Sequence, residues 1–248
     1  MELRLQGLRA LVTGASSGIG EGVALSLAAE GAELVLAGRD EAALDRVAGE
    51  TRQAGAAGVA IVAADVTAPD GLSRVGAAAG GALILVNCAG GSRPTRWDSG
   101  EDVWEEAFAL NFDAARRLSS LLIPGMKAAR FGRIVNISGS MEPRGLNAAS
   151  AAKAALHLWS KGLSCDLAPF GITVNCVAPG RINSRQILTR LHPDQEARER
   201  FIADNIPAGY FGDPADVGHA VAFLASPLAR YITGVVIPVD GGMRRSAM

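Results

Sequence analysis

Short runs of apolar residues alternate along the chain with longer stretches in which apolar and polar residues recur at helical spacing. The apolar runs are rich in valine, isoleucine and leucine, which is typical of strands that are buried on both faces of a sheet. The pattern predicts seven strands, at Leu8–Thr13, Glu33–Gly38, Val59–Ala63, Leu83–Asn87, Arg133–Ile137, Thr173–Val177 and Val235–Val239.

Helical patterns fill most of the intervals between these strands. Strands that alternate with helices form parallel sheets, and right-handed crossovers place the helices on both faces. The sequence therefore predicts an α/β fold with a Rossmann-type, doubly wound, seven-stranded and mainly parallel sheet. Pro124 predicts a kink or break near the end of the longest helix. The predicted helices are Gly18–Glu30, Asp40–Ala54, Asp102–Ala129, Asn147–Leu167 and Asp213–Ala225, and the polar region from Ser184 to Asn205 is also helical in pattern.

Length and composition narrow the class of protein. The chain has 248 residues with neither a linker nor a repeat, which predicts one domain over residues 1–248 with a substrate-loop region at about 184–212. A formal net charge of -1 argues against a partner such as nucleic acid or an anionic membrane that is held by bulk charge. The three cysteines lack metal-ligand spacing, so no metal is expected. The first strand pattern begins close to Met1 and no apolar run approaches ~20 residues, which predicts a cytoplasmic protein.

Glycines follow the first predicted strand, at the edge of the sheet where doubly wound proteins bind ligands. Their spacing is G-x-x-x-G-x-G, and a helical pattern begins within it. Glycines let the backbone turn tightly and approach a pyrophosphate, and the start of a helix attracts that anion. The alternative is a flexible strand-to-helix turn without a ligand. The residues of the turn that would bind phosphate are Gly14, Ser16, Ser17, Gly18, Ile19 and Gly20.

Thr13 directly precedes these glycines, and further short sequence motifs follow along the chain. They are Asp65-Val66, Asn87-Cys88-Ala89-Gly90, Asn111, the stretch from Gly132 to Ser138, Lys153, Asn175-Cys176-Val177-Ala178-Pro179-Gly180, and Tyr231-Ile232-Thr233-Gly234 running to Asp240-Gly241-Gly242. Over roughly residues 7 to 243 the chain resembles the short-chain dehydrogenase/reductase family, in particular its 3-oxoacyl-ACP-reductase-like members.

The resemblance implies a nicotinamide dinucleotide cofactor. Arg39 ends the second strand, where an acidic residue would bind the ribose hydroxyl of NAD(H) and an arginine can pair with the 2′-phosphate of NADP(H). NADP(H) is therefore favoured, although Asp40 beside Arg39 leaves NAD(H) and a solvent-exposed arginine as alternatives. The resemblance assigns the adenine to Asp65 and Val66, the middle of the cofactor to Asn87, Ala89 and Gly90, and the nicotinamide end to Lys153, Pro179, Gly180, Ile182 and Ser184.

The implied catalytic centre departs from the family pattern. Asn111 and Lys153 match the catalytic asparagine and lysine, whereas Ala149 stands at the position of the catalytic tyrosine. The position of the substrate-binding serine falls on Gly139, so that either Ser138 or Ser140 is a candidate.

A different proton donor would then be needed. Ser140 and Ser150 are poor acids unaided, and Lys153 could donate directly if burial lowered its pKa. Glu142 and His157 lie near in sequence, with a solvated loop and a packed helix residue as their simpler interpretations.

Three functions remain open at this point. The favoured one is an NAD(P)(H)-dependent oxidoreductase that acts on a carbonyl or alcohol substrate through an atypical active site. The others are a catalytically degenerate NADP-binding structural or regulatory protein, and a lyase or isomerase on the same scaffold. The resemblance also implies a homotetramer. Four loop arginines predict a small anionic substrate, with ordinary solvated arginines as the alternative; they are Arg93, Arg144, Arg181 and Arg185.

Overall fold

A seven-stranded parallel sheet forms the centre of the protein, with strand order β3-β2-β1-β4-β5-β6-β7. The structure is a computed structural model that describes residues 2–139, 142–143, 145–184, 187–188 and 193–246. The predicted doubly wound, Rossmann-type sheet is confirmed. The strands are β1 (Arg9–Thr13), β2 (Glu33–Gly38), β3 (Gly58–Ala63), β4 (Ile84–Asn87), β5 (Gly132–Ile137), β6 (Ile172–Pro179) and β7 (Val236–Val239).

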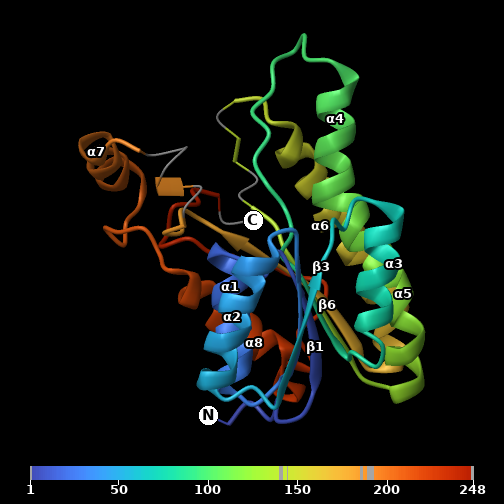
Figure 1. Ribbon diagram of the computed structural model, residues 1–248. Helices are drawn as coiled ribbons and strands as arrows, with labels where there is room; N and C mark the ends of the chain where they lie inside the picture. Colours follow the sequence, from blue (N-terminus) through green and yellow to red (C-terminus); the bar gives the residue numbers. More distant parts are fainter. Residues whose placement is uncertain (1, 140–141, 144, 185–186, 189–192, 247–248) are drawn as a thin grey trace.

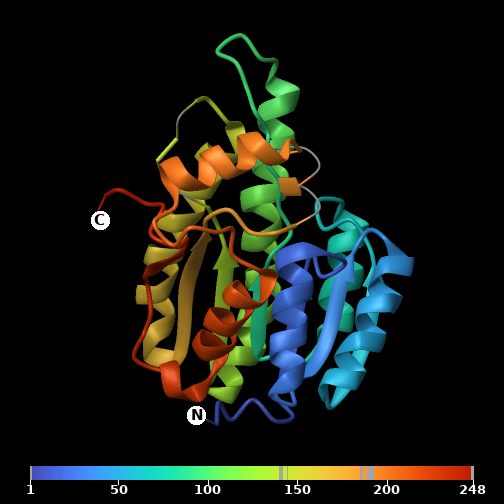
Figure 2. The same ribbon diagram turned by 90° about the vertical axis from the view of Figure 1, so that its left-hand side faces the viewer.

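Helices cover both faces of the sheet, as Figure 1 shows. One face carries α1 (Gly18–Ala29), α2 (Glu41–Ala54) and α8 (Pro214–Ala225). The other carries α3 (Pro69–Ala78), α4 (Glu101–Phe108), the π-helical turn η1 (Ala109–Asp113), α5 (Ala114–Ala129) and α6 (Ala148–Leu167). Helix α7 (Gln195–Asn205) lies beyond the carboxyl ends of the strands (Figure 2), and two short 3₁₀ turns are η2 (Ala168–Phe170) and η4 (Pro227–Ala229).

Successive residues of each strand enter opposite cores. In β1, Val12 packs into the core beneath α1 and α8, whereas Leu11 packs into the core beneath α3 and α5. Both side chains are fully buried. This explains why the strands are mostly apolar and why the sequence showed no alternation of apolar and polar residues.

Helix starts follow the capping chemistry of single side chains. The Asp40 carboxylate accepts a hydrogen bond from the backbone N–H of Ala43 and so caps α2. Asn147 caps α6 in the same way, through the N–H of Ala149. The predicted helices Asp40–Ala54 and Asn147–Leu167 therefore each included the cap residue.

The observed helices differ from the prediction in three respects. The single helix predicted at Asp102–Ala129 consists of α4 and α5 joined by η1. Pro124 does not break α5, which continues to Ala129. Helix α3 was not predicted at all, because Gly71 and Gly76 weaken its helical pattern.

The order of the strands fixes where a ligand can enter. The chain moves from β1 outwards to β3, and then returns to the other side of β1 to continue with β4. The connections after β1 and β4 therefore leave in opposite directions and open a crevice at the carboxyl ends of these strands.

Candidate functional site

A pocket of about 940 Å³ lies at this crevice. Its volume is near the upper end of the range of about 300–1,000 Å³ that is usual for ligand sites. We call it the central pocket. It is lined by residues 14, 16–20, 37–39, 64–66, 88–92, 94, 110–111, 137–139, 142–143, 145–147, 149–150, 153, 179–181, 184, 187, 201, 243 and 245.

The glycine turn after β1 forms the floor of one end. Gly14 and Gly18 adopt left-handed backbone conformations, with φ of 65° and 57°. A Cβ on Gly14 would lie 2.9 Å from the backbone nitrogen of Ala89, and a Cβ on Gly20 would collide with the carbonyl oxygen of Gly14. Ser17 is the N-cap residue of α1 but makes no side-chain capping bond. The first N–H groups of α1 are therefore not capped by Ser17.

Thr13 joins the glycine turn to the loop after β4. Its buried hydroxyl oxygen accepts hydrogen bonds from the backbone N–H groups of Cys88 and Ala89, each at 3.1 Å. One threonine at the end of β1 therefore sets the distance between two walls of the central pocket.

A series of hydrogen-bonded, buried polar side chains supports the loop after β4. Asn87 Nδ2 donates to Asn136 Oδ1 at 2.8 Å, and Asn136 Nδ2 donates to Ser160 Oγ at 2.9 Å. The link ties the ends of β4 and β5 to α6. Asn87 therefore lies under the pocket and does not line it.

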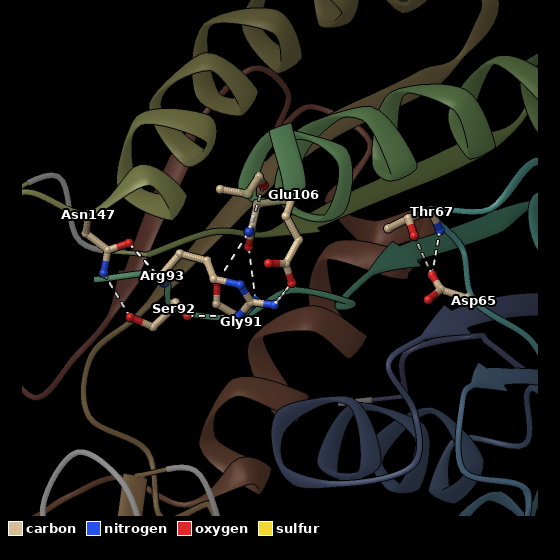
Figure 3. Close-up of polar contacts among 9 residues, drawn as sticks. Asp65, Thr67, Gly91, Ser92, Arg93, Glu106 and Asn147 are labelled. Carbon is tan, nitrogen blue, oxygen red and sulfur yellow. Dashed lines mark hydrogen bonds and ion pairs between the residues drawn. The ribbon is translucent and has the colours of Figure 1, made fainter. Parts of the chain in front are cut away.

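Arg39 and Asp65 lie at the end of the pocket formed by β2 and β3. The guanidinium of Arg39 is exposed and makes no hydrogen bond or ion pair within the described part of the chain. Asp40 faces the start of α2, which it caps. The Asp65 carboxylate accepts from the N–H and hydroxyl of Thr67 (Figure 3), and these bonds together with nearby Arg39 lower its pKa.

The π-helical turn η1 points Asn111 into the pocket wall. Asn111 is 1% exposed, its Oδ1 accepts from the Gly91 N–H at 3.1 Å, and its Nδ2 donates to the Ala107 carbonyl at 2.9 Å. The asparagine thus holds the loop after β4 at Gly91, beyond the residues that Thr13 holds.

Lys153 of α6 meets Asn111 at Gly90. A Cβ on Gly90 would lie 3.0 Å from Asn111 Oδ1 and 3.2 Å from Lys153 Nζ, so a larger residue there would press on both side chains. Lys153 Nζ donates to the Ile137 carbonyl at 2.7 Å. Burial lowers the pKa of Lys153 to about 8.

Ala149 lies one helical turn before Lys153, is 6% exposed and lines the same wall of the pocket. Tyr210 and Tyr231 are 61% and 98% exposed and line no part of it. Ser138 lines the pocket while its hydroxyl donates to the Val177 carbonyl at 3.1 Å. Ser140 lies outside the described residues.

Figure 3 shows how the loop after β4 docks on the start of α6. Asn147 Oδ1 accepts from the backbone N–H of Arg93, and its Nδ2 donates to Ser92 Oγ at 2.8 Å. The Arg93 guanidinium forms an ion pair with Glu106 of α4 and does not line the pocket. Among the predicted arginines, Arg181 does line it, whereas Arg144 and Arg185 lie outside the described residues.

Glu142 and His157, which were considered as proton donors, and Cys88 have different surroundings. Burial lowers the pKa of His157 to about 4 and raises that of Cys88 to about 12. His157 does not line the pocket, whereas Cys88 does. Glu142 also lines the pocket, and its carboxylate accepts from the N–H groups of Arg245 and Ser246.

The structure brings most of the predicted site residues to one pocket. Asn87 and Ile182 are buried behind the wall and do not line it. Sequence reasoning missed Ile187, Phe201, Met243 and Arg245, which come from the segment after β6, from α7 and from the C-terminal tail. The predicted residues that line the pocket are Gly14, Ser16, Ser17, Gly18, Ile19, Gly20, Arg39, Asp65, Val66, Ala89, Gly90, Asn111, Ser138, Lys153, Pro179, Gly180 and Ser184.

The described residues lack two kinds of feature. They contain no group of three or more histidine, cysteine, aspartate or glutamate side chains placed to hold a metal ion. In the same residues, no helix has both the length and the apolar character that crossing a membrane requires.

Known proteins match the chain over nearly its whole length. The family profile described as enoyl-(acyl carrier protein) reductase matches residues 14–244. The chain is 36% identical to 3-oxoacyl-(acyl-carrier-protein) reductase of Pseudomonas aeruginosa, over 98% of this chain and 100% of that protein. It is 37% identical to galactitol 2-dehydrogenase (L-tagatose-forming) of Cereibacter sphaeroides, over 96% of each chain.

A solved structure gives the same result for the fold. L-sorbose reductase from Gluconobacter frateurii superposes with a TM-score of 0.94 at 31% identity, over 99% of this chain and 100% of that one. The chain belongs to the short-chain dehydrogenase/reductase family, whose members are oxidoreductases.

Proposed function

We propose that the chain is an NAD(P)(H)-dependent oxidoreductase that interconverts a carbonyl group and an alcohol on a small molecule, with NADP(H) preferred. The observation that carries the proposal is the meeting of Asn111, Lys153 and Gly90 in a pocket whose other end is the glycine turn. The L-sorbose reductase structure contains NADPH and L-sorbose. The names of the other two relatives give an oxoacyl carrier protein and galactitol as substrates, which supports the reaction type without selecting a substrate.

The pocket fits such a cofactor. At Gly14 and Gly20 a side chain would collide with the backbone, so the turn presents bare peptide groups beside the start of α1. Peptide N–H groups at the start of a helix suit a pyrophosphate. Residues 14–20 would hold the phosphates, Asp65 and Val66 the adenine, and Lys153 with residues 179–184 the nicotinamide end. When bound, the nicotinamide supplies or accepts the hydride.

Arg39 supports the preference for NADP(H). Its guanidinium lines the pocket without a hydrogen bond to another described residue, whereas Asp40 is engaged as the cap of α2. A free guanidinium can pair with a 2′-phosphate through two parallel hydrogen bonds. Asp40 is therefore a poor competitor for the ribose hydroxyl.

We further propose that the catalytic centre is atypical and that Lys153 transfers the proton. Ala149 has no acidic group, and neither described tyrosine lines the pocket. Lys153 has a pKa of about 8, whereas that of Cys88, in the same wall, is about 12. A general acid works best when its pKa is near the working pH, and contributes about 10²–10⁴-fold in rate.

The neighbouring residues would orient this proton. The Ile137 carbonyl accepts one N–H of Lys153, which leaves two others that can be directed towards the pocket. Asn111 holds Gly91, so that the loop opposite Lys153 keeps its position. Ser138 can accept a hydrogen bond from a substrate hydroxyl while its own hydroxyl continues to donate to the Val177 carbonyl.

The pocket also supports the prediction of one domain over residues 1–248. Its wall combines residues from Gly14 near the start of the chain to Arg245 near the end.

The alanine at position 149 also favours the alternative function, which is a cofactor-binding protein with little or no catalysis.

The test begins with a fluorescence titration of NADPH, followed by reduction of a ketone panel between pH 6 and 10. Wild-type protein should bind NADPH, and its reduction rate should fall about tenfold per pH unit above about 8, as the Lys153 ammonium loses its proton. Lys153→Arg should keep NADPH binding and lose about 10²-fold or more in rate, because arginine does not give up its proton.

Lys161→Met is the matched control, since Lys161 is exposed on the same helix and does not line the pocket. It should leave both measurements unchanged. Absence of NADPH binding would contradict the proposed function. NADPH binding without turnover of any ketone or alcohol would favour the non-catalytic alternative.

A further inference from the structure

The C-terminal tail, residues 240–246, is held beside the central pocket by two carboxylates. Asp240 accepts hydrogen bonds from the N–H groups of Gly242 and Arg244, at 2.9 and 3.0 Å. Glu142, in the loop after β5, accepts from the N–H of Arg245 with both oxygens, at 3.1 and 3.0 Å, and from that of Ser246 at 2.6 Å. The tail is therefore anchored on both sides of Arg245.

The anchored tail places the Arg245 side chain in the pocket wall. Its guanidinium is exposed and makes no hydrogen bond or ion pair with any described residue. The Glu142 carboxylate beside it is occupied by backbone N–H groups, and these bonds lower its pKa. Glu142 thus fixes the backbone of Arg245 and leaves the guanidinium available to a ligand.

A second arginine lies close to the tail. Arg181 follows Gly180, and a Cβ on Gly180 would lie 2.7 Å from the Cα of Asp240, where the tail begins. Arg181 lines the pocket and stacks on Phe201 of α7, 5.3 Å from the ring centroid. Lys153 adds a third cationic side chain to the described wall, against the single carboxylate of Glu142 at this end.

We propose that Arg245 and Arg181 bind a carboxylate of the substrate at the mouth of the central pocket, and that Glu142 is the positioning residue for Arg245. The proposal rests on the proposed function, because the carboxylate is taken to be part of the substrate. Arginine binds a carboxylate through two parallel hydrogen bonds, and the exposed position lets a charged group enter without full dehydration.

The position separates this subsite from the phosphates of the cofactor. Arg39 follows β2 and the glycine turn follows β1, whereas Arg245 is tied to the loop after β5. Two strand intervals separate β1 from β5 and three separate β2 from β5, which is about 10 Å and about 14 Å at about 4.8 Å per strand. A phosphate is the other anion that these arginines could meet, so the experiment includes it.

The test compares levulinate, a small oxo acid, with its neutral amide in ligand-observed NMR titrations, with and without NADP⁺. Wild-type protein should bind levulinate about tenfold or more tightly than the amide, as expected for charge-assisted hydrogen bonds. Arg245→Met should weaken levulinate about tenfold and leave the amide and NADP⁺ unchanged. Glu142→Gln should give a smaller loss in the same direction, and Arg244→Met, a neighbouring arginine outside the pocket wall, should give none.

Equal affinity of wild-type protein for the two probes would overturn the proposal, as would an Arg245→Met variant that weakens both equally. A loss of NADP⁺ affinity instead of levulinate affinity would mean that Arg245 serves a cofactor phosphate. Failure of wild-type protein to bind NADP⁺ would contradict the proposed function, while the titrations without NADP⁺ would still decide the role of Arg245. Unchanged melting temperatures of the variants would confirm that their folds are intact.

Discussion

Replacing Thr13 by valine should destabilise the protein and loosen the pocket at the same time. Valine has nearly the shape of threonine but cannot accept the hydrogen bonds from the N–H groups of Cys88 and Ala89. Thr13 is 1% exposed, so water cannot easily replace its hydroxyl. The two N–H groups would then lack their acceptor at the turn that lines the central pocket.

The expected magnitude follows from the number of broken bonds. An unsatisfied buried donor costs about 1–3 kcal/mol, so two of them at the edge of a pocket should cost about 2–4 kcal/mol. This is a large share of a typical unfolding free energy of about 5–15 kcal/mol. Thr13→Ser keeps the acceptor and loses only a buried methyl group, which should cost about 1 kcal/mol.

Urea denaturation at one fixed protein concentration would measure both variants, because subunit association would make stability depend on concentration. Thr13→Val should lower the midpoint without changing the slope, and it should weaken NADPH binding more than Thr13→Ser does. If Thr13→Val were as stable as Thr13→Ser and bound NADPH equally well, Thr13 would not be the anchor of this loop.

Three further changes test other parts of the molecule. Arg39→Asp should weaken NADPH binding about 10- to 100-fold, as expected for loss of a charge-assisted hydrogen bond, and calorimetry should show NADH bound more tightly than NADPH. Equal affinities of wild-type protein for the two cofactors would remove the argument from Arg39. Ala149→Tyr should raise turnover on generic ketones, and an unchanged rate with NADPH still bound would mean that the site has diverged from the family reaction. Light scattering should give a mass well above the 25.5 kDa of one chain, towards that of a tetramer. Leu158→Glu should lower this mass, because Leu158 on α6 is 77% exposed and suits an interface between helices. A monomeric wild-type protein would contradict the prediction.

The strands and most helices could be predicted because their signals are local. Strands that are buried on both faces are mostly apolar, and the bounds of every predicted strand lie within two residues of those observed. Helix α3 shows where this fails. Val75 and Ala79 are buried one turn apart and Leu72 packs against the same core, but glycines within the helix hide this spacing.

Some parts of the site could likewise be predicted from local sequence and others could not. The glycine turn could be recognised because its residues are contiguous and its chemistry belongs to the backbone. The bond from Glu142 to the C-terminal tail could not be predicted, because its partners are 103 residues apart and come together only in the folded chain. Arg93 was predicted to face a ligand. Its ion-pair partner Glu106 lies 13 residues further along the chain, in α4, and could not be identified as the partner from sequence alone.

The π-helical turn η1 has a consequence for how this chain can change in length. A π turn contains one more residue per turn than the α-helices on either side, and here it carries Asn111. Deleting one residue between Ala109 and Asp113 would let α4 and α5 fuse into a regular helix, and each residue of such a helix turns by about 100°. Because the π turn already absorbs this extra residue, α4 and α5 would keep nearly the same faces towards the sheet, and only the residues of the turn, Asn111 among them, would change direction. Among relatives, a one-residue alignment gap at this turn should therefore leave the packing of α5 on the sheet unchanged and should remove the hydrogen bond between Asn111 and Gly91.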